Sequence, residues 1–157
     1  MWCRLLFLTF LLGGCASTSK HAVTTTSNET DSLVASIERS VCFGTCPAYK
    51  LTVYRSGLLQ FEGYRNTSKT GKYFTYVNQQ PLLELCEKAH SLGYFELQDQ
   101  YRNEMIADLP TVTTFLRCGN RQKGVVFFDL ECPQALKSVQ DLIDGLAPAD
   151  SMWMPTK

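Results

Sequence analysis

The residues in this chain best suited to chemistry are its cysteines, seven in 157 residues. Cys42 and Cys46 are separated by three residues, of which the middle one is Gly44, a spacing that lets the two Cα atoms approach within the roughly 4.4–6.8 Å that a disulfide needs. The same pair of thiols is also suited to redox chemistry, or to binding zinc as two of its ligands. The pair therefore has three interpretations: a structural disulfide, a redox pair or half of a zinc site.

The surrounding sequence favours the disulfide. Thioredoxin-type chemistry uses a two-residue gap at a helix N-terminus, whereas here the gap is three and the chain enters a predicted strand. A zinc site would need Cys118 and Cys132 as well, but a predicted hairpin holds these about 25 Å apart, so they share neither a metal nor a disulfide. Redox and zinc chemistry remain the alternatives.

The N-terminus has the pattern of a signal peptide. Arg4 precedes the apolar run from Leu5 to Leu12, which covers about 12 Å as a helix and is too short to span a bilayer of roughly 30 Å. We therefore expect residues 1–14 to be removed on export.

The next residues, Leu12-Gly13-Gly14-Cys15, resemble a bacterial lipobox. This resemblance implies cleavage before Cys15, diacylation of its sulfur and acylation of its amino group, which would anchor the protein in a membrane. Ala16 resembles the residue found after the lipidated cysteine in outer-membrane lipoproteins. We expect a bacterial cell-envelope protein on the outer membrane with its domain in the periplasm, where disulfides form. The alternative is a plain secretory signal with Cys15 as an ordinary thiol.

Charge and composition restrict the partners of the exported chain. The full sequence has 15 basic and 15 acidic residues, so loss of Arg4 leaves a net charge of about −1, which gives no attraction for nucleic acid. Residues 15–32 are rich in Ser and Thr and nearly free of apolar side chains, which predicts a lipidated, flexible tether. Residues 33–147 then form one globular domain, and residues 148–157 a C-terminal tail.

Within the domain, some segments have the alternating apolar pattern of strands and others the three-to-four-residue apolar spacing of helices. The pattern predicts the order strand-strand-strand-helix-strand-strand-helix, in an antiparallel sheet of about five to six strands with two helices packed on one face, an α+β fold. A weaker stretch, Leu33 to Arg39, is expected as an additional edge strand, and residues 94–107 as a connector. The first helix follows Asn78 and ends at Gly93. The second begins at Cys132-Pro133.

The remaining cysteines and histidines have ordinary structural interpretations. Cys86 lies on the apolar stripe of the first helix, so we expect Cys86, Cys118 and Cys132 to be mainly buried thiols. Cys132, at a helix N-terminus, should be the most acidic of them. His90 lies beside the same stripe and has no nucleophile motif with it.

A longer motif, Cys42-Phe43-Gly44-Thr45-Cys46-Pro47-Ala48-Tyr49, resembles a bacterial domain family of unknown function found in secreted proteins and lipoproteins. The resemblance continues through Asp108-Leu109-Pro110-Thr111 and covers roughly residues 37–147. It implies no activity. It marks Asp108, Thr111 and Tyr49 as candidate ligand-binding residues, although an Asp before Leu-Pro-Thr also commonly satisfies backbone donors at the start of a strand.

These observations favour a lipid-anchored envelope protein with a non-catalytic binding or structural domain. The sequence contains no phosphate-binding loop, paired-histidine metal motif or serine nucleophile elbow, so we predict no catalytic residues, metal or cofactor. The expected partners are the membrane, through the anchor, and an envelope protein or glycan. The alternatives are a thiol redox protein using Cys42 and Cys46, and a hydrolase or sugar-binding protein built around Asp108 with His90 and the tyrosines.

Overall fold

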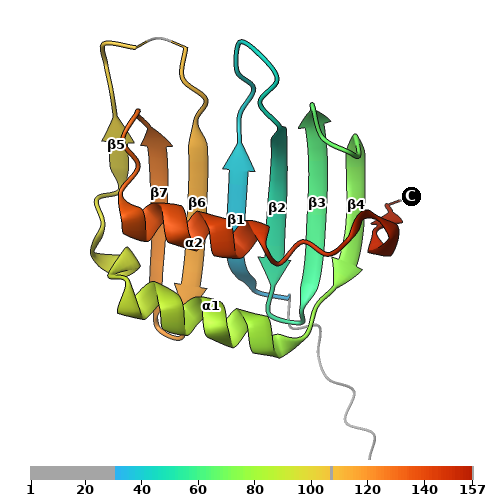
Figure 1. Ribbon diagram of the computed structural model, residues 1–157. Helices are drawn as coiled ribbons and strands as arrows, with labels where there is room; N and C mark the ends of the chain where they lie inside the picture. Colours follow the sequence, from blue (N-terminus) through green and yellow to red (C-terminus); the bar gives the residue numbers. More distant parts are fainter. Residues whose placement is uncertain (1–30, 107, 157) are drawn as a thin grey trace, which may run out of the picture.

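A computed structural model describes residues 31–106 and 108–156, which form a mixed eight-stranded sheet (Figure 1). The strands lie side by side in the order β5-β7-β6-β1-β2-β3-β4-β8. All neighbours run antiparallel except β5 and β7, which are parallel. Their bounds are β1 Leu33–Arg39, β2 Ala48–Tyr54, β3 Leu58–Arg65, β4 Gly71–Tyr76, β5 Gln100–Arg102, β6 Val112–Cys118, β7 Arg121–Phe128 and β8 Met154–Pro155.

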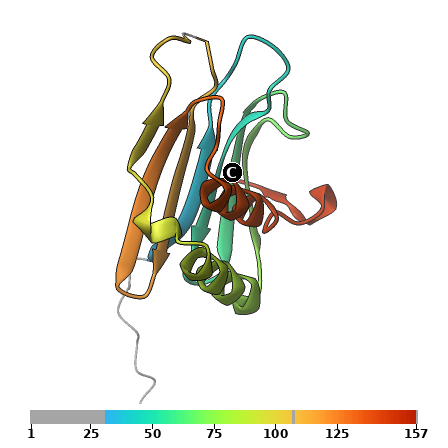
Figure 2. The same cartoon turned by 60° about the vertical axis from the view of Figure 1, so that its left-hand side comes forward.

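Two helices, α1 (Gln79–Ser91) and α2 (Gln134–Asp144), cover the same face of the sheet (Figure 2). Apolar residues three and four positions apart give each helix one buried stripe: Leu82, Leu85 and Ala89 on α1, and Leu136, Val139 and Ile143 on α2. The stripes pack on alternate strand residues, which include Ala35, Ile37, Leu51, Val53, Leu59, Leu116 and Val125. The predicted α+β class is confirmed.

The tight turn between β2 and β3 depends on Gly57. Its φ of 87° lies in the left-handed region, and a Cβ there would come within 2.3 Å of the Val77 carbonyl oxygen. The Gly57 amide donates to Tyr54 O at 3.0 Å, and the Val77 amide donates to Gly57 O at 2.9 Å. This turn therefore also fixes the chain that leaves β4.

The sheet has more strands than predicted, and it is not wholly antiparallel. β5 lies within the expected connector, after the short 3-10 helix η1 (Tyr94–Glu96), and β8 lies within the expected tail. Strands of two or three residues are too short to show an alternating pattern, so only their pairing partners reveal them.

The position of β1 also corrects the prediction. The expected edge strand lies inside the sheet, where Ile37 is paired with Leu51 of β2 on one side and with Thr114 of β6 on the other. Ala35 and Ile37 are fully buried. Because the β1–β6 pair joins segments more than 70 residues apart, neither local pattern could indicate it.

A second disulfide, between Cys86 and Cys118, corrects the expectation of three buried thiols. The Cα atoms of Cys86 and Cys118 are 5.6 Å apart, and those of Cys42 and Cys46 are 5.8 Å apart. Cys86 faces inward as predicted. Because α1 runs across the end of β6, Cys86 there meets Cys118, the last residue of β6, and the two are bonded. Cys132 is the free cysteine among the described residues.

The C-terminal residues dock on the domain. After η2 (Asp150–Met152), the half-buried Trp153 places its ring 5.6 Å from Phe61, which stacks on Tyr49 at 5.5 Å. The predicted signal peptide, Cys15 and the tether up to residue 30 lie outside the described residues. None of the described helices is both long and apolar enough to cross a membrane.

The two ends of the sheet carry different parts of the chain (Figure 1). The chain enters β1 at the lower end of the view, opposite the upper end where the β1–β2, β5–β6 and β7–α2 loops lie. A seven-residue strand spans about 20 Å. The N-terminal attachment of the domain and these loops are therefore about one strand length apart.

Candidate functional site

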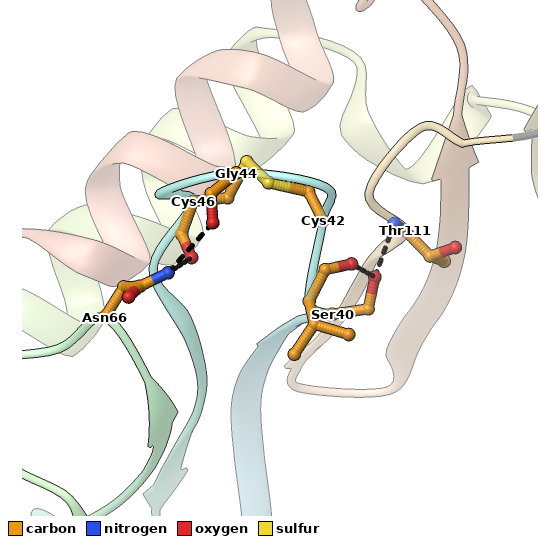
Figure 3. Close-up of a disulfide and its surroundings, with 7 residues drawn as sticks. Ser40, Cys42, Gly44, Cys46, Asn66 and Thr111 are labelled. Carbon is orange, nitrogen blue, oxygen red and sulfur yellow. Dashed lines mark hydrogen bonds between the residues drawn. A yellow bond between two sulfur atoms is a disulfide. The ribbon is translucent and has the colours of Figure 1, made fainter.

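The Cys42–Cys46 disulfide closes the β1–β2 loop at the upper end of the sheet (Figure 3). Inside the loop, the Gly44 amide donates to Cys42 O at 2.9 Å. The predicted disulfide is present, and a five-residue ring contributes about 2 kcal/mol of chain-entropy stabilisation. Its main effect is to fix the shape of the loop before β2.

Hydrogen bonds from two neighbouring segments hold this loop on both sides (Figure 3). The Asn66 side chain donates to Gly44 O at 3.2 Å and to Cys46 O at 3.3 Å. The Thr111 amide donates to Ser40 Oγ at 2.8 Å, and the Ser40 amide donates to Thr111 O at 2.9 Å. The disulfide loop is thus tied to the β3–β4 turn and to the β5–β6 loop.

Beneath the loop, Arg39, Tyr49 and Asp144 form a half-buried cluster. The Tyr49 hydroxyl donates to Asp144 Oδ1 at 2.6 Å and accepts from Arg39 Nε at 3.0 Å, while Arg39 Nη2 lies 2.7 Å from Asp144 Oδ2. Burial, followed by the hydrogen bond to Asp144, raises the pKa of Tyr49 to about 12. A phenol with this pKa is protonated at neutral pH and cannot act there as a base.

The same cluster explains how α2 is held on the sheet. Asp144 is the last residue of α2, where the helix dipole disfavours a carboxylate, and the Arg39 guanidinium supplies the compensating charge. The cluster joins β1, β2 and α2 and borders a hollow of about 320 Å³ that is also lined by Pro47 and Pro110. This geometry is that of a structural contact that holds α2 on the sheet.

The three predicted ligand residues lie at this end of the sheet but not in one cavity. Tyr49 borders the hollow beside Asp144, whereas the exposed Asp108 borders a separate open hollow of about 540 Å³ with Phe43. At Thr111, the Ser40 hydroxyl accepts a hydrogen bond from the backbone amide, which is the structural role that the sequence suggests for Asp108. Ligand binding by Asp108, Thr111 and Tyr49 stays a prediction.

The structure separates His90 from Asp108. The exposed His90 packs on Phe95 with ring centroids 4.7 Å apart, and Arg121, paired with the last residue of β6, lies over the same ring. Asp108 precedes the first residue of β6, so the two lie at opposite ends of that strand. They do not form a common hydrolase or sugar site.

Only one of the five cysteines among the described residues is a free thiol. Cys42, Cys46, Cys86 and Cys118 are bonded in pairs. Burial raises the pKa of Cys132, so the acidic thiol predicted at this helix N-terminus is wrong, because desolvation outweighs the nearby Lys137 charge. Within residues 31–106 and 108–156, no group of three or more His, Cys, Asp or Glu side chains is placed to hold a metal ion.

The three most exposed large apolar side chains among the described residues lie on the upper loops. Met105 is 95% exposed, Phe43 93% and Leu130 67%, and Val41, beside the disulfide, is 55% exposed. We call these loops, residues 40–47, 103–106, 108–111 and 129–133, the loop rim. Sequence reasoning missed this site because the amphipathic patterns of helices and strands do not apply to loops. The position of Phe43 between two bonded cysteines was the one available signal.

Hydrogen bonds position the two outer loops of the rim. The Asn103 side chain donates to Asp129 Oδ1 at 3.3 Å and accepts from the Met105 amide at 3.1 Å. Asp129 Oδ1 also accepts from the Leu130 amide at 2.6 Å. These bonds fix the backbone that presents Met105 and Leu130 to solvent.

Comparisons with known proteins agree with the motif. No curated protein matches the chain. A family model described as a domain of unknown function (DUF6438) matches residues 33–147, a span that contains both helices, β1 to β7 and the whole loop rim. The two disulfides fit an extracytoplasmic protein. The chain belongs to this family of unknown function.

Proposed function

We propose that the protein is a lipid-anchored bacterial cell-envelope protein whose domain binds a partner through the loop rim, without catalysis. The observation that carries the proposal is the exposure of Met105, Phe43, Leu130 and Val41 on loops at one end of the sheet. Exposed apolar side chains concentrated at one end of a soluble protein often mark an interaction site.

The rim is also built to keep these side chains exposed. A disulfide closes the loop that carries Phe43, and side-chain bonds of Asn66, Asn103 and Asp129 fix the surrounding backbone. A preorganised apolar surface binds with little loss of conformational entropy. Burial of a Phe side chain that is 93% exposed would contribute about 1.5–3 kcal/mol, or roughly tenfold to 150-fold in affinity.

The anchor rests on the Leu12-Gly13-Gly14-Cys15 motif and on the placement of the domain. With lipids on Cys15, the chain enters the domain at the end opposite the rim, which leaves the rim free to face away from the membrane. The Cys15→Ala variant should move from the membrane fraction to the soluble fraction. Continued partition with membranes would refute the anchor.

Binding is tested on the full-length protein extracted with mild detergent from its own envelopes. On a native gel we expect the wild type to migrate above its monomer mass, and Phe43→Ala to migrate as the monomer. Leu83→Ala on α1 is the matched control, because Leu83 is 58% exposed but lies away from the rim, and this variant should migrate like the wild type. Monomeric wild type, or a complex that survives Phe43→Ala, would refute binding through the rim.

A further inference from the structure

We infer that the partner of the loop rim is a protein surface on which basic side chains surround an apolar contact. This inference rests on the proposed function and names the chemistry of the partner. Its basis is the charge of the rim, because its loop segments contain Glu104, Asp108, Asp129 and Glu131 but no Lys or Arg.

The carboxylates lie next to the exposed apolar residues. Glu104 precedes Met105, and Glu131 follows Leu130; both glutamates are exposed. Asp108 is exposed and borders the open hollow of about 540 Å³ together with Val41 and Phe43. Each apolar contact would therefore form with a carboxylate at its margin, the arrangement of apolar centre and polar margin found in protein interfaces.

Two cations flank the rim without neutralising it. Arg65 borders the hollow near Asp108, and Arg102 lies over the Phe128 ring at 5.6 Å. Arg39 is already paired with Asp144. The rim keeps an acidic excess that attracts a basic partner and repels anionic lipid head groups.

The charge of the rim favours a protein occupant. Exposed apolar loops can also insert into a bilayer, and a flexible tether would let the rim reach one. Its carboxylates would have to approach the anionic surface of a membrane. A basic protein surface satisfies both the apolar and the acidic groups.

The test is photo-cross-linking of the full-length lipidated protein in isolated envelopes, with benzoyl-phenylalanine at position 105 or at position 130. We expect adducts with protein at both positions. Raising KCl from 50 to 300 mM should lower the yield about threefold or more, because the longer Debye length at low salt strengthens attraction between charges at the interface.

Charge variants complete the test. Glu104→Gln and Glu131→Gln together should lower the adduct yield severalfold, whereas Glu87→Gln, an exposed carboxylate on α1, should leave it unchanged. Adducts with lipid or peptidoglycan, no adduct, or a protein adduct insensitive to salt and to the two substitutions would overturn the inference. A Phe43-dependent complex on the native gel without this charge dependence would leave the proposed function standing and refute only the basic partner.

Discussion

The Cys86–Cys118 disulfide should stabilise the fold more than the Cys42–Cys46 disulfide. The bonded cysteines are 32 positions apart in the first and 4 in the second, so the rings contain about 33 and 5 residues. The chain-entropy relation gives about 3.7 and 2 kcal/mol at 25 °C. Replacing Cys118 by Ala also removes a buried sulfur, since this residue is only 7% exposed, and this further increases the free energy lost with the Cys86–Cys118 disulfide.

The comparison uses two double variants, Cys86→Ala/Cys118→Ala and Cys42→Ala/Cys46→Ala. Both are made with Cys132→Ala in the background, so that thiol exchange cannot form new disulfides. The free energy of unfolding from urea titration should fall by at least about 1.5–2 kcal/mol more in the first variant than in the second. The reference is the Cys132→Ala protein with both disulfides.

An equal loss in the two variants, or a larger loss from the small loop, would refute this reasoning. It would show that the Cys42–Cys46 disulfide stabilises the whole fold, rather than only fixing the shape of its own loop. The native gel is a separate measurement, because the Cys42→Ala/Cys46→Ala variant should lose the complex while it stays folded.

Three further predictions concern single features of the fold. The pKa of Tyr49 is raised from its ordinary 10.0 to about 12, so the stabilising effect of its protonated hydroxyl is complete below pH 10 and is lost as the pH rises through 12. Urea titrations at increasing pH should show the wild type losing this stability relative to Tyr49→Phe. Stabilities of the two proteins that change in parallel with pH would contradict the prediction. Gly57→Ala should lower the stability measured by thermal unfolding by more than about 2 kcal/mol, and Gly119→Ala should lower it by about 1 kcal/mol. Both glycines have a positive φ, but only at Gly57 would the added Cβ clash with a carbonyl oxygen, that of Val77. Similar losses in the two variants would disprove the clash. The Cys42–Cys46 bridge should have a reduction potential below about −300 mV in glutathione titrations, and a value near −200 mV would instead support redox chemistry.

Much of the fold follows from alternation along the chain. The buried faces of β2, β3 and β6 and the apolar stripes of both helices are readable as periods of two and of three to four residues. The position of β1 and the short strands β5 and β8 are not, because they depend on pairing between distant segments. The Cys86–Cys118 bridge was missed for the same reason, since it requires knowing that α1 crosses the end of β6.

The candidate site was predictable only in part. The Cys42–Cys46 spacing within the motif indicated a closed loop, and the structure confirms it. The exposure of Met105 and Leu130 depends on side-chain bonds of Asn103 and Asp129, which are 26 residues apart and share no motif. Loop contacts of this kind have no periodicity from which to infer them.

Binding at the loop rim is tested most directly by one photo-cross-linking measurement in living cells. Benzoyl-phenylalanine is placed at position 43, where it keeps an aromatic ring, or at position 120, an exposed residue in the β6–β7 turn at the opposite end of the sheet. We expect a discrete protein adduct from position 43 and none from position 120. No adduct from position 43, or equal adducts from both positions, would contradict a binding function for the rim.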